Sequence, residues 1–133
     1  MVHSLACVAW RDAESDANRR EVIIASRLYL FVMSPSQAAV ELDIAAVQAA
    51  LKADGLDGWL LYDFRGLNSI ALDVTGVARQ GGHLATRRWY YLIPASGEPR
   101  GLVHAIEKTS LAHLPGSTTR YAGRTQLEEA LRV

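Results

Sequence analysis

Three polar residues with the potential for chemistry, Asp63, Arg65 and Asn68, directly follow the apolar run 58–62 (GWLLY). In open α/β sheets, ligands bind beyond the carboxyl ends of strands, so a binding site at this position is a reasonable expectation. Arg65 could make a bidentate contact with a carboxylate of a substrate or of a neighbouring subunit. The structural alternative is an Asx-turn at Asn68 and a solvated or locally paired Arg65. Both interpretations stay open.

Asp63 allows a further hypothesis, because a small metal-dependent nuclease would place a metal-binding aspartate at such a strand end. A hydrolytic two-metal site needs several carboxylates or imidazoles that converge on the metals. The other candidate acids, Asp73, Glu98 and Glu107, fall in separate predicted elements. We therefore favour a structural role, in which Asp63 accepts backbone hydrogen bonds in its own turn.

The histidine and cysteine spacing does not indicate a metal site. The histidines form no short-spaced pair of the HExxH kind and are expected to be structural or solvated: His3, His83, His104 and His113. A single cysteine, Cys7, allows neither an internal disulfide nor a cysteine-based zinc site. We expect no cofactor or metal in this chain.

The segment 87–91 (RRWYY) mixes cations and aromatic rings, as proteins that bind single-stranded nucleic acid do. On a strand, however, successive side chains point to opposite faces. Trp89 and Tyr91 then share one face, and Arg88 and Tyr90 share the other. We expect packing on one face and interface contacts on the other, with Arg88 and Trp89 as candidate contact residues.

Composition narrows the class of protein. The 133 residues fit one domain, and 14 Lys and Arg balance 14 Asp and Glu. This balance argues against a nucleic-acid partner and against a polybasic membrane-surface protein. The apolar run 22–32 is shorter than the roughly 20 residues that a transmembrane helix needs. The single cysteine favours a reduced, cytoplasmic setting.

The first helix is predicted over about 35–54. Ser34 and Pro35 form a helix start, and an apolar stripe follows at helical spacing, Val40, Ile44, Val47 and Leu51. Gly55 is a suitable stop. The run 58–62 then predicts a strand buried on both faces.

The later segments alternate between helix and strand. We predict a polar loop over 63–68, a short helix over 69–74 and a glycine-rich loop over 75–86. Strands over 87–93 and 101–106 form a hairpin around a turn at 94–99. A short helix over 107–114, a strand over 118–121 and a helix capped by Thr125, with Glu128 in the capping-box position, complete the series. The order indicates an α/β fold with a mixed β-sheet flanked by helices.

Residues 1–33 differ from the rest, since a polar stretch precedes an apolar one without clear periodicity. A signal peptide is one interpretation, but Glu21 and Arg27 break its pattern. We favour a poorly ordered extension, or a start of translation at Met33. The regular domain then spans 34–133.

Several segments in order resemble the N-terminal domain of the creatinase, prolidase and aminopeptidase P family of Xaa-Pro metallopeptidases. They are 51–63 (LKADGLDGWLLYD), 63–68 (DFRGLN), 88–94 (RWYYLIP), a Gly-Glu-Pro turn and 101–104 (GLVH). The resemblance covers about 36–133. Many members carry an aromatic residue between the Asn and Thr-Gly that match Asn68 and Thr75-Gly76, and this chain lacks it, which leaves the subfamily open.

The resemblance implies a ribonuclease-H-like α/β domain without catalytic residues. It would make oligomer contacts and shape access to the active site of a C-terminal pita-bread domain. That second domain would bind two divalent metals, manganese, cobalt or zinc, and hydrolyse proline-containing peptides. The implied partners are that peptidase domain and neighbouring subunits. The alternative from a different class is a free-standing module that binds a small ligand or peptide.

Overall fold

The computed structural model describes residues 7–10, 42–77 and 85–132, with side chains from 42 onward. Its elements follow the order β1 (Cys7–Trp10), α2 (Ile44–Ala53), β2 (Gly58–Asp63), α3 (Ser69–Thr75), β3 (Trp89–Pro94), β4 (Arg100–His104), η2 (Ala105–Glu107), β5 (Ser117–Tyr121) and α4 (Arg124–Ala130). The predicted extension 1–33 lies outside the described residues except for β1. The helix start at Ser34 and Pro35 and most of the loop 75–86 also lie outside them.

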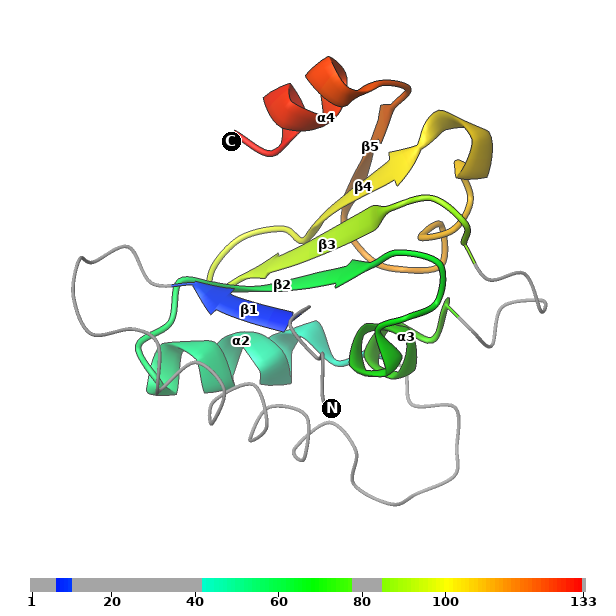
Figure 1. Cartoon of the computed structure of the whole chain (residues 1–133). Coiled ribbons are helices and arrows are strands. Elements are labelled where there is room, and N and C mark those ends of the chain that lie inside the picture. The colour runs from blue at the N-terminus through cyan, green and yellow to red at the C-terminus, as the bar shows by residue number, and fades with distance from the viewer. Residues whose placement is uncertain (1–6, 11–41, 78–84, 133) are drawn as a thin grey trace, which may run out of the picture.

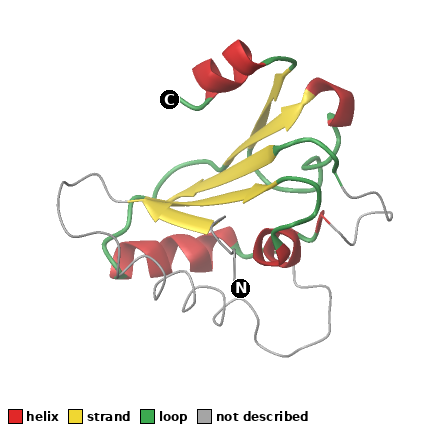
Figure 2. Ribbon diagram, in the orientation of Figure 1, coloured by secondary structure: helices red, strands yellow, loops and turns green. Residues whose placement is uncertain are grey.

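The five strands form one mixed sheet in the order β1-β2-β3-β4-β5. The first three pairings are antiparallel, and β5 runs parallel to β4. Helices α2 and α3 lie on one side of the sheet, while α4 lies on the other side beside β5 (Figures 1 and 2). The predicted α/β class, the mixed sheet and the hairpin between β3 and β4 are therefore confirmed.

The core lies between the sheet and the α2–α3 layer. Alternate residues of β2 and β3 point into it and are almost fully buried: Trp59, Leu61, Asp63, Trp89, Tyr91 and Ile93. Val47 and Leu51 of α2 pack against them in the same cluster. On the opposite face, Leu60 and Tyr62 are only half-buried. The expectation of a strand buried on both faces is thus wrong, because helices cover only one face of β2.

Helix α2 begins later than the sequence predicted. Residues 42–43 are not helical, and the side chain of Asp43 caps the helix by accepting a hydrogen bond from the Ala46 N–H at 3.0 Å. An aspartate cap satisfies one of the free N–H groups of the first turn, which fixes the boundary at Ile44. At the other end, Gly55 takes a φ of 66°, as the predicted stop requires.

Two predicted helices differ from the structure. The segment 107–114 is not an α-helix: the 3₁₀ helix η2 leads into turns closed by i to i+3 bonds, such as Ala112 N–H to Thr109 O at 3.1 Å. The last helix is capped by Gly123 and not by Thr125, and Glu128 pairs with Arg124 at 2.6 Å instead of closing a capping box. Gln126, in the third position of the helix, accepts the N–H of Ala122, the residue before the cap, at 2.8 Å.

Strand β5 reaches its parallel position beside β4 through a close backbone approach. Gly116 has a φ of 100°, and an added Cβ would lie 2.1 Å from the Pro99 carbonyl oxygen. The hydroxyl of Tyr91 donates to the Pro115 carbonyl at 2.7 Å, which holds the same connection against the core. Burial raises the pKa of Tyr91 to about 12, so this donor stays protonated at physiological pH.

None of the described helices is long and apolar enough to cross a membrane.

Truncation of a core leucine tests this packing. Leu51 is completely buried in α2, so Leu51→Ala should lower the free energy of unfolding by about 2–5 kcal/mol. Leu67 is 80% exposed, and Leu67→Ala should change the free energy of unfolding by no more than about 0.5 kcal/mol. Urea denaturation measured by circular dichroism gives both values. Equal losses in the two variants would contradict the assigned core.

Candidate anion-binding cleft

Asp63 ends β2 and organises the loop that follows it. Its side chain is fully buried, and its two carboxylate oxygens accept the Gly66 N–H and the Asn68 N–H, each at 2.9 Å. Burial of a carboxylate is unfavourable unless hydrogen bonds replace its water, and these two bonds do so. These hydrogen bonds therefore support the structural role of Asp63, as an acceptor of backbone N–H groups in its own turn.

Asn68 holds the other end of this loop, residues 64–67, through its side-chain hydrogen bonds. Its side-chain oxygen accepts the Ala71 N–H at 3.3 Å and so caps α3, while its amide donates to the Tyr62 carbonyl at 2.5 Å. The side chain is 7% exposed. Asn68 thus holds loop 64–67 in place instead of offering its own side chain to a ligand.

The fastened loop presents Arg65 at the surface. Arg65 is the non-glycine residue with positive φ, 59°, in the described part of the chain. Such a conformation costs about 1–3 kcal/mol and is found preferentially at functional sites. Its guanidinium carbon lies 4.9 Å from the centroid of the Phe64 ring, and that of Arg88 lies 4.6 Å from the same centroid. Two cations from separate strand ends therefore meet around one aromatic ring.

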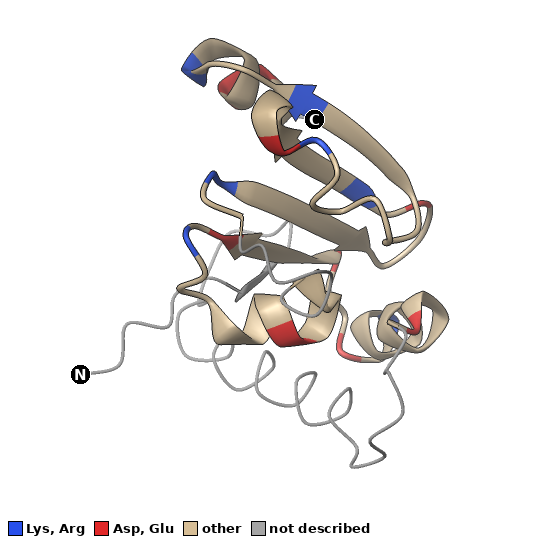
Figure 3. Ribbon diagram, turned by 90° about the vertical axis from the view of Figure 1, so that its right-hand side faces the viewer, with Lys and Arg blue, Asp and Glu red and all other residues tan. Residues whose placement is uncertain are grey.

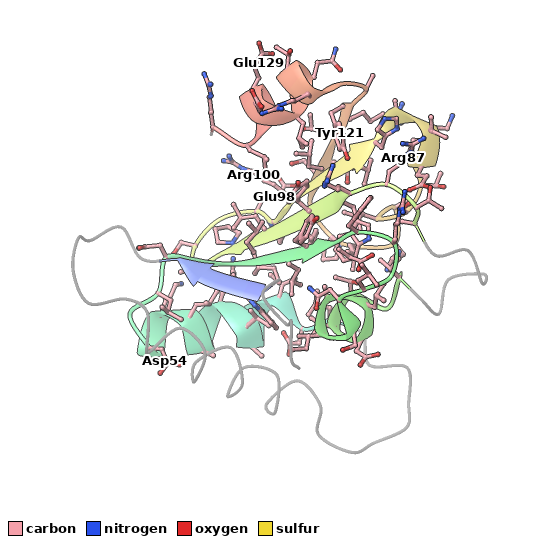
Figure 4. All side chains as sticks on the ribbon, viewed as in Figure 1. Asp54, Arg87, Glu98, Arg100, Tyr121 and Glu129 are labelled. Atoms are coloured by element: carbon pink, nitrogen blue, oxygen red, sulfur yellow. The ribbon has the colours of Figure 1, made fainter. Side chains whose placement is uncertain are left out.

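These residues line a cleft of about 460 Å³ at the end of the sheet. Loop 64–65, the segment 86–88, the end of β4, and the start of α4 contribute its walls, which include Arg65, Arg87, Arg88, His104, Tyr121 and Arg124. Figure 3 shows basic segments at neighbouring strand ends, and Figure 4 shows Arg87 and Tyr121 at the same end of the sheet. We call this set of residues the arginine cleft.

Most of this positive charge is not neutralised by nearby acids. Among the described residues, the one salt bridge in the cleft joins Arg124 to Glu128. Arg65, Arg87 and Arg88 are exposed and form no salt bridge within that part of the chain. An arginine fork matches the planar geometry of a carboxylate, so the cleft is suited to an anionic group.

Tyrosine and histidine side chains stiffen the walls. The Tyr121 hydroxyl donates to the Arg88 carbonyl at 2.6 Å, and the His104 ring packs edge-on against Tyr121 with centroids 5.1 Å apart. Tyr62 and Tyr90 lie beside them with centroids 5.0 Å apart. Burial raises the pKa of both Tyr90 and Tyr121, which keeps these phenols protonated at neutral pH. A hydrogen bond with Tyr62 raises the pKa of Arg88.

Glu107 anchors the segment that brings Arg87 and Arg88 to the cleft. One carboxylate oxygen accepts the Thr86 N–H at 2.8 Å and the Thr86 hydroxyl at 2.6 Å, and the other accepts the Arg87 N–H at 3.0 Å. Burial alone would raise the pKa of Glu107. The hydrogen bonds from Thr86 and Arg87, together with the charge of Arg87, outweigh burial and lower it.

Trp89 does not reach the surface. It is 1% exposed and points into the core with Tyr91, as strand alternation predicted, while Arg88 is exposed and Tyr90 faces the other side. The expectation that Trp89 contacts a partner is therefore not met in this arrangement. Its indole N–H and that of Trp59 are buried with no hydrogen-bond partner in the described structure.

Of the predicted site residues, the structure brings Arg65 and Arg88 together and gives Asp63 and Asn68 supporting roles. Arg87, Tyr121, Arg124 and Glu107 were not predicted. Arg124 reaches the cleft only through the crossover to β5 and α4, which sequence spacing does not reveal. The adjacency of Arg87 to Arg88 was the one available signal.

Within residues 42–77 and 85–132, no group of three or more His, Cys, Asp or Glu side chains could hold a metal ion.

The sequence matches no protein-family model, and no curated protein is significantly similar to it.

The hydrogen bonds that Glu107 accepts from Thr86 and Arg87, which we call the Glu107 clasp, predict a pH-dependent contribution to stability. Because its pKa is lowered from 4.5 on folding, the contribution is present above pH 4.5 and is lost as the pH falls through the folded-state value. Glu107→Gln should reduce the free energy of unfolding at pH 7 by about 1 kcal/mol or less, since the group is largely solvated. The difference in the free energy of unfolding between the wild type and Glu107→Gln should become smaller at pH 3.

Urea midpoints at pH 7 and pH 3 measure this gap. Glu129, which is exposed on α4, provides the matched control Glu129→Gln. A gap for Glu107→Gln that is constant with pH would rule out the clasp.

Proposed function

We propose that this chain is a non-catalytic recognition domain of the kind that precedes the peptidase domain in Xaa-Pro metallopeptidases. Its arginine cleft would hold a carboxylate of a peptide or of a neighbouring subunit. The observation that carries this proposal is the meeting of Arg65, Arg87 and Arg88 in one cleft, where none of their guanidinium groups forms a salt bridge with a described carboxylate. Glu107 lies near Arg87 but binds its backbone N–H.

A carboxylate suits the cleft better than a neutral ligand does. Arginine remains charged at every physiological pH and can donate two parallel hydrogen bonds to both oxygens of a carboxylate. The protonated Tyr90 is a hydrogen-bond donor close to Arg88, whereas Tyr121 already donates its proton to the Arg88 carbonyl. Since no acid in the described part of the chain neutralises Arg65 and Arg88, a bound anion would relieve their mutual repulsion.

The mixed α/β sheet and the position of loop 63–68 are compatible with the resemblance to peptidase N-terminal domains. The two divalent metals of such enzymes do not fit the described residues, because no three His, Cys, Asp or Glu side chains converge among them. We therefore assign the metals and the hydrolysis of proline-containing peptides to a separate C-terminal domain of a parent protein. We also propose a cytoplasmic setting without a nucleic-acid or membrane partner.

A free-standing peptide-binding module is the second candidate. It is favoured by the fact that the arginine cleft is formed by side chains of this single chain. Sequencing the locus beyond the codon for Val133 separates the two. A continuing frame with spaced Asp, Asp, His, Glu and Glu supports the peptidase, whereas an immediate stop removes it and leaves the module.

Replacement of the cleft arginines tests the binding role. Arg65→Gln and Arg88→Gln should each weaken binding of a short Xaa-Pro peptide with a free carboxyl terminus about tenfold or more, because a charge-assisted hydrogen bond contributes about 1.5–3 kcal/mol. Arg120→Gln is the control, since Arg120 alternates with Thr119 and Tyr121 on β5 and does not line the cleft. Isothermal titration calorimetry measures the affinities. Unchanged binding in both cleft variants would refute this role.

The second test concerns catalysis. The purified chain with added manganese should release no amino acid from an Xaa-Pro peptide, because the proposal places the metal ligands in another domain. Amino-acid analysis of the reaction mixture detects any hydrolysis. Hydrolysis that a chelator abolishes, in protein free of other peptidases, would overturn the assignment.

A further inference from the structure

The outer face of the sheet carries an apolar groove that adjoins the arginine cleft. Strand register places Leu60 opposite Leu92, and Tyr90 opposite Leu102, in neighbouring cross-strand rows. Together with Arg100, and with Ala130 and Leu131 at the end of α4, these side chains line a groove of about 680 Å³. This volume lies in the range of small-ligand sites. Leu131 is 46% exposed, so the groove is open to solvent along α4.

Helix α4 forms a wall of both hollows. Its first turn contributes Arg124, and its next turn Leu127, to the arginine cleft, while its end lines the apolar groove. Tyr90 lies at the junction, because it lines the groove and its ring contacts Tyr62 near Arg88. The two hollows together, which we call the trough, are therefore apolar in the middle. The arginine cleft lies at one end, and Arg100, opposite Leu92 in the strand register, lies at the other.

We infer that this trough binds an apolar peptide segment that ends in a carboxylate. The apolar side chains would occupy the groove, and the carboxylate would lie among the arginines of the cleft. The inference rests on the proposed function and adds to it the chemical class of the bound segment. Charge complementarity favours this direction, since the cleft offers Arg65, Arg87 and Arg88 to a C-terminal carboxylate, whereas Arg100 is the one arginine among the described residues that lines the groove.

The dimensions agree with a short extended peptide. The seven residues of α4 span about 10 Å at 1.5 Å per residue. An extended peptide rises about 3.3 Å per residue, so about three residues fit beneath the helix. Ser117 and Thr119 also line the groove, and their side chains carry hydroxyls that can bond to a peptide backbone. A fatty acid has no amide groups along its chain to meet these hydroxyls, which favours the peptide.

Three synthetic probes separate the contributions of the two ends: acetyl-trileucine, its C-terminal amide, and acetyl-triserine with a free carboxylate. We expect acetyl-trileucine to bind at least tenfold more tightly than either of the others in calorimetric titrations. Leu92→Ser should remove most of the preference for trileucine over triserine. Methyl NMR spectra of the wild type should show shifts at Leu60, Leu92 and Leu102, which tests the site even if the variant fails to fold.

The outcomes are distinguishable. Equal binding of trileucine and triserine, both better than the amide, overturns this inference and leaves the carboxylate cleft intact. Equal binding of acetyl-trileucine and of its C-terminal amide overturns the proposed function, since the carboxylate would then contribute nothing. Octanoate binding as tight as that of trileucine would assign the trough to a lipid instead. A dimer in light scattering that Leu92→Ser dissociates would assign it to a second copy of the chain.

Discussion

The buried carboxylate of Asp63 is the constraint on which the described site depends. It lies at the end of a strand whose inward residues form the core, and both of its oxygens are bound by backbone N–H groups of the next loop. A carboxylate in this position would be strongly unfavourable without these bonds. The requirement to satisfy it therefore fixes the path of the chain from the sheet to α3, and with it the place of Arg65.

The sheet has two unlike faces because helices α2 and α3 cover only one of them. The covered face holds the large buried rings of Trp59, Trp89 and Tyr91. On the other face, leucines, Tyr90 and Arg100 line an open groove, and further arginines gather where the strands end. The covered face accounts for stability, while the open face carries the hollows in which we place recognition.

The elements that depend on local periodicity and on residues adjacent in the chain could be predicted from the sequence. The strand over 58–62, the short helix after Asn68 and the hairpin were predictable, because their apolar patterns and turn residues are contiguous. The start of α2 was not, since the predicted helix runs through residues 42–43 and its apolar pattern gives no sign that Asp43 caps α2. The arginine cleft was only half predictable: Arg65 and Arg88 follow from their strand positions. Arg124 and the Glu107 clasp depend on long-range connections.

Side-chain NMR of the arginines tests the central claim most directly. In ¹⁵N-labelled protein, the Nε–H resonances of Arg65 and Arg88 should shift and saturate together as acetyl-trileucine is added, while that of Arg120 stays in place. This result would show a carboxylate held in the arginine cleft. Resonances of Arg65 and Arg88 that do not move, or that move no more than that of Arg120, would contradict the account.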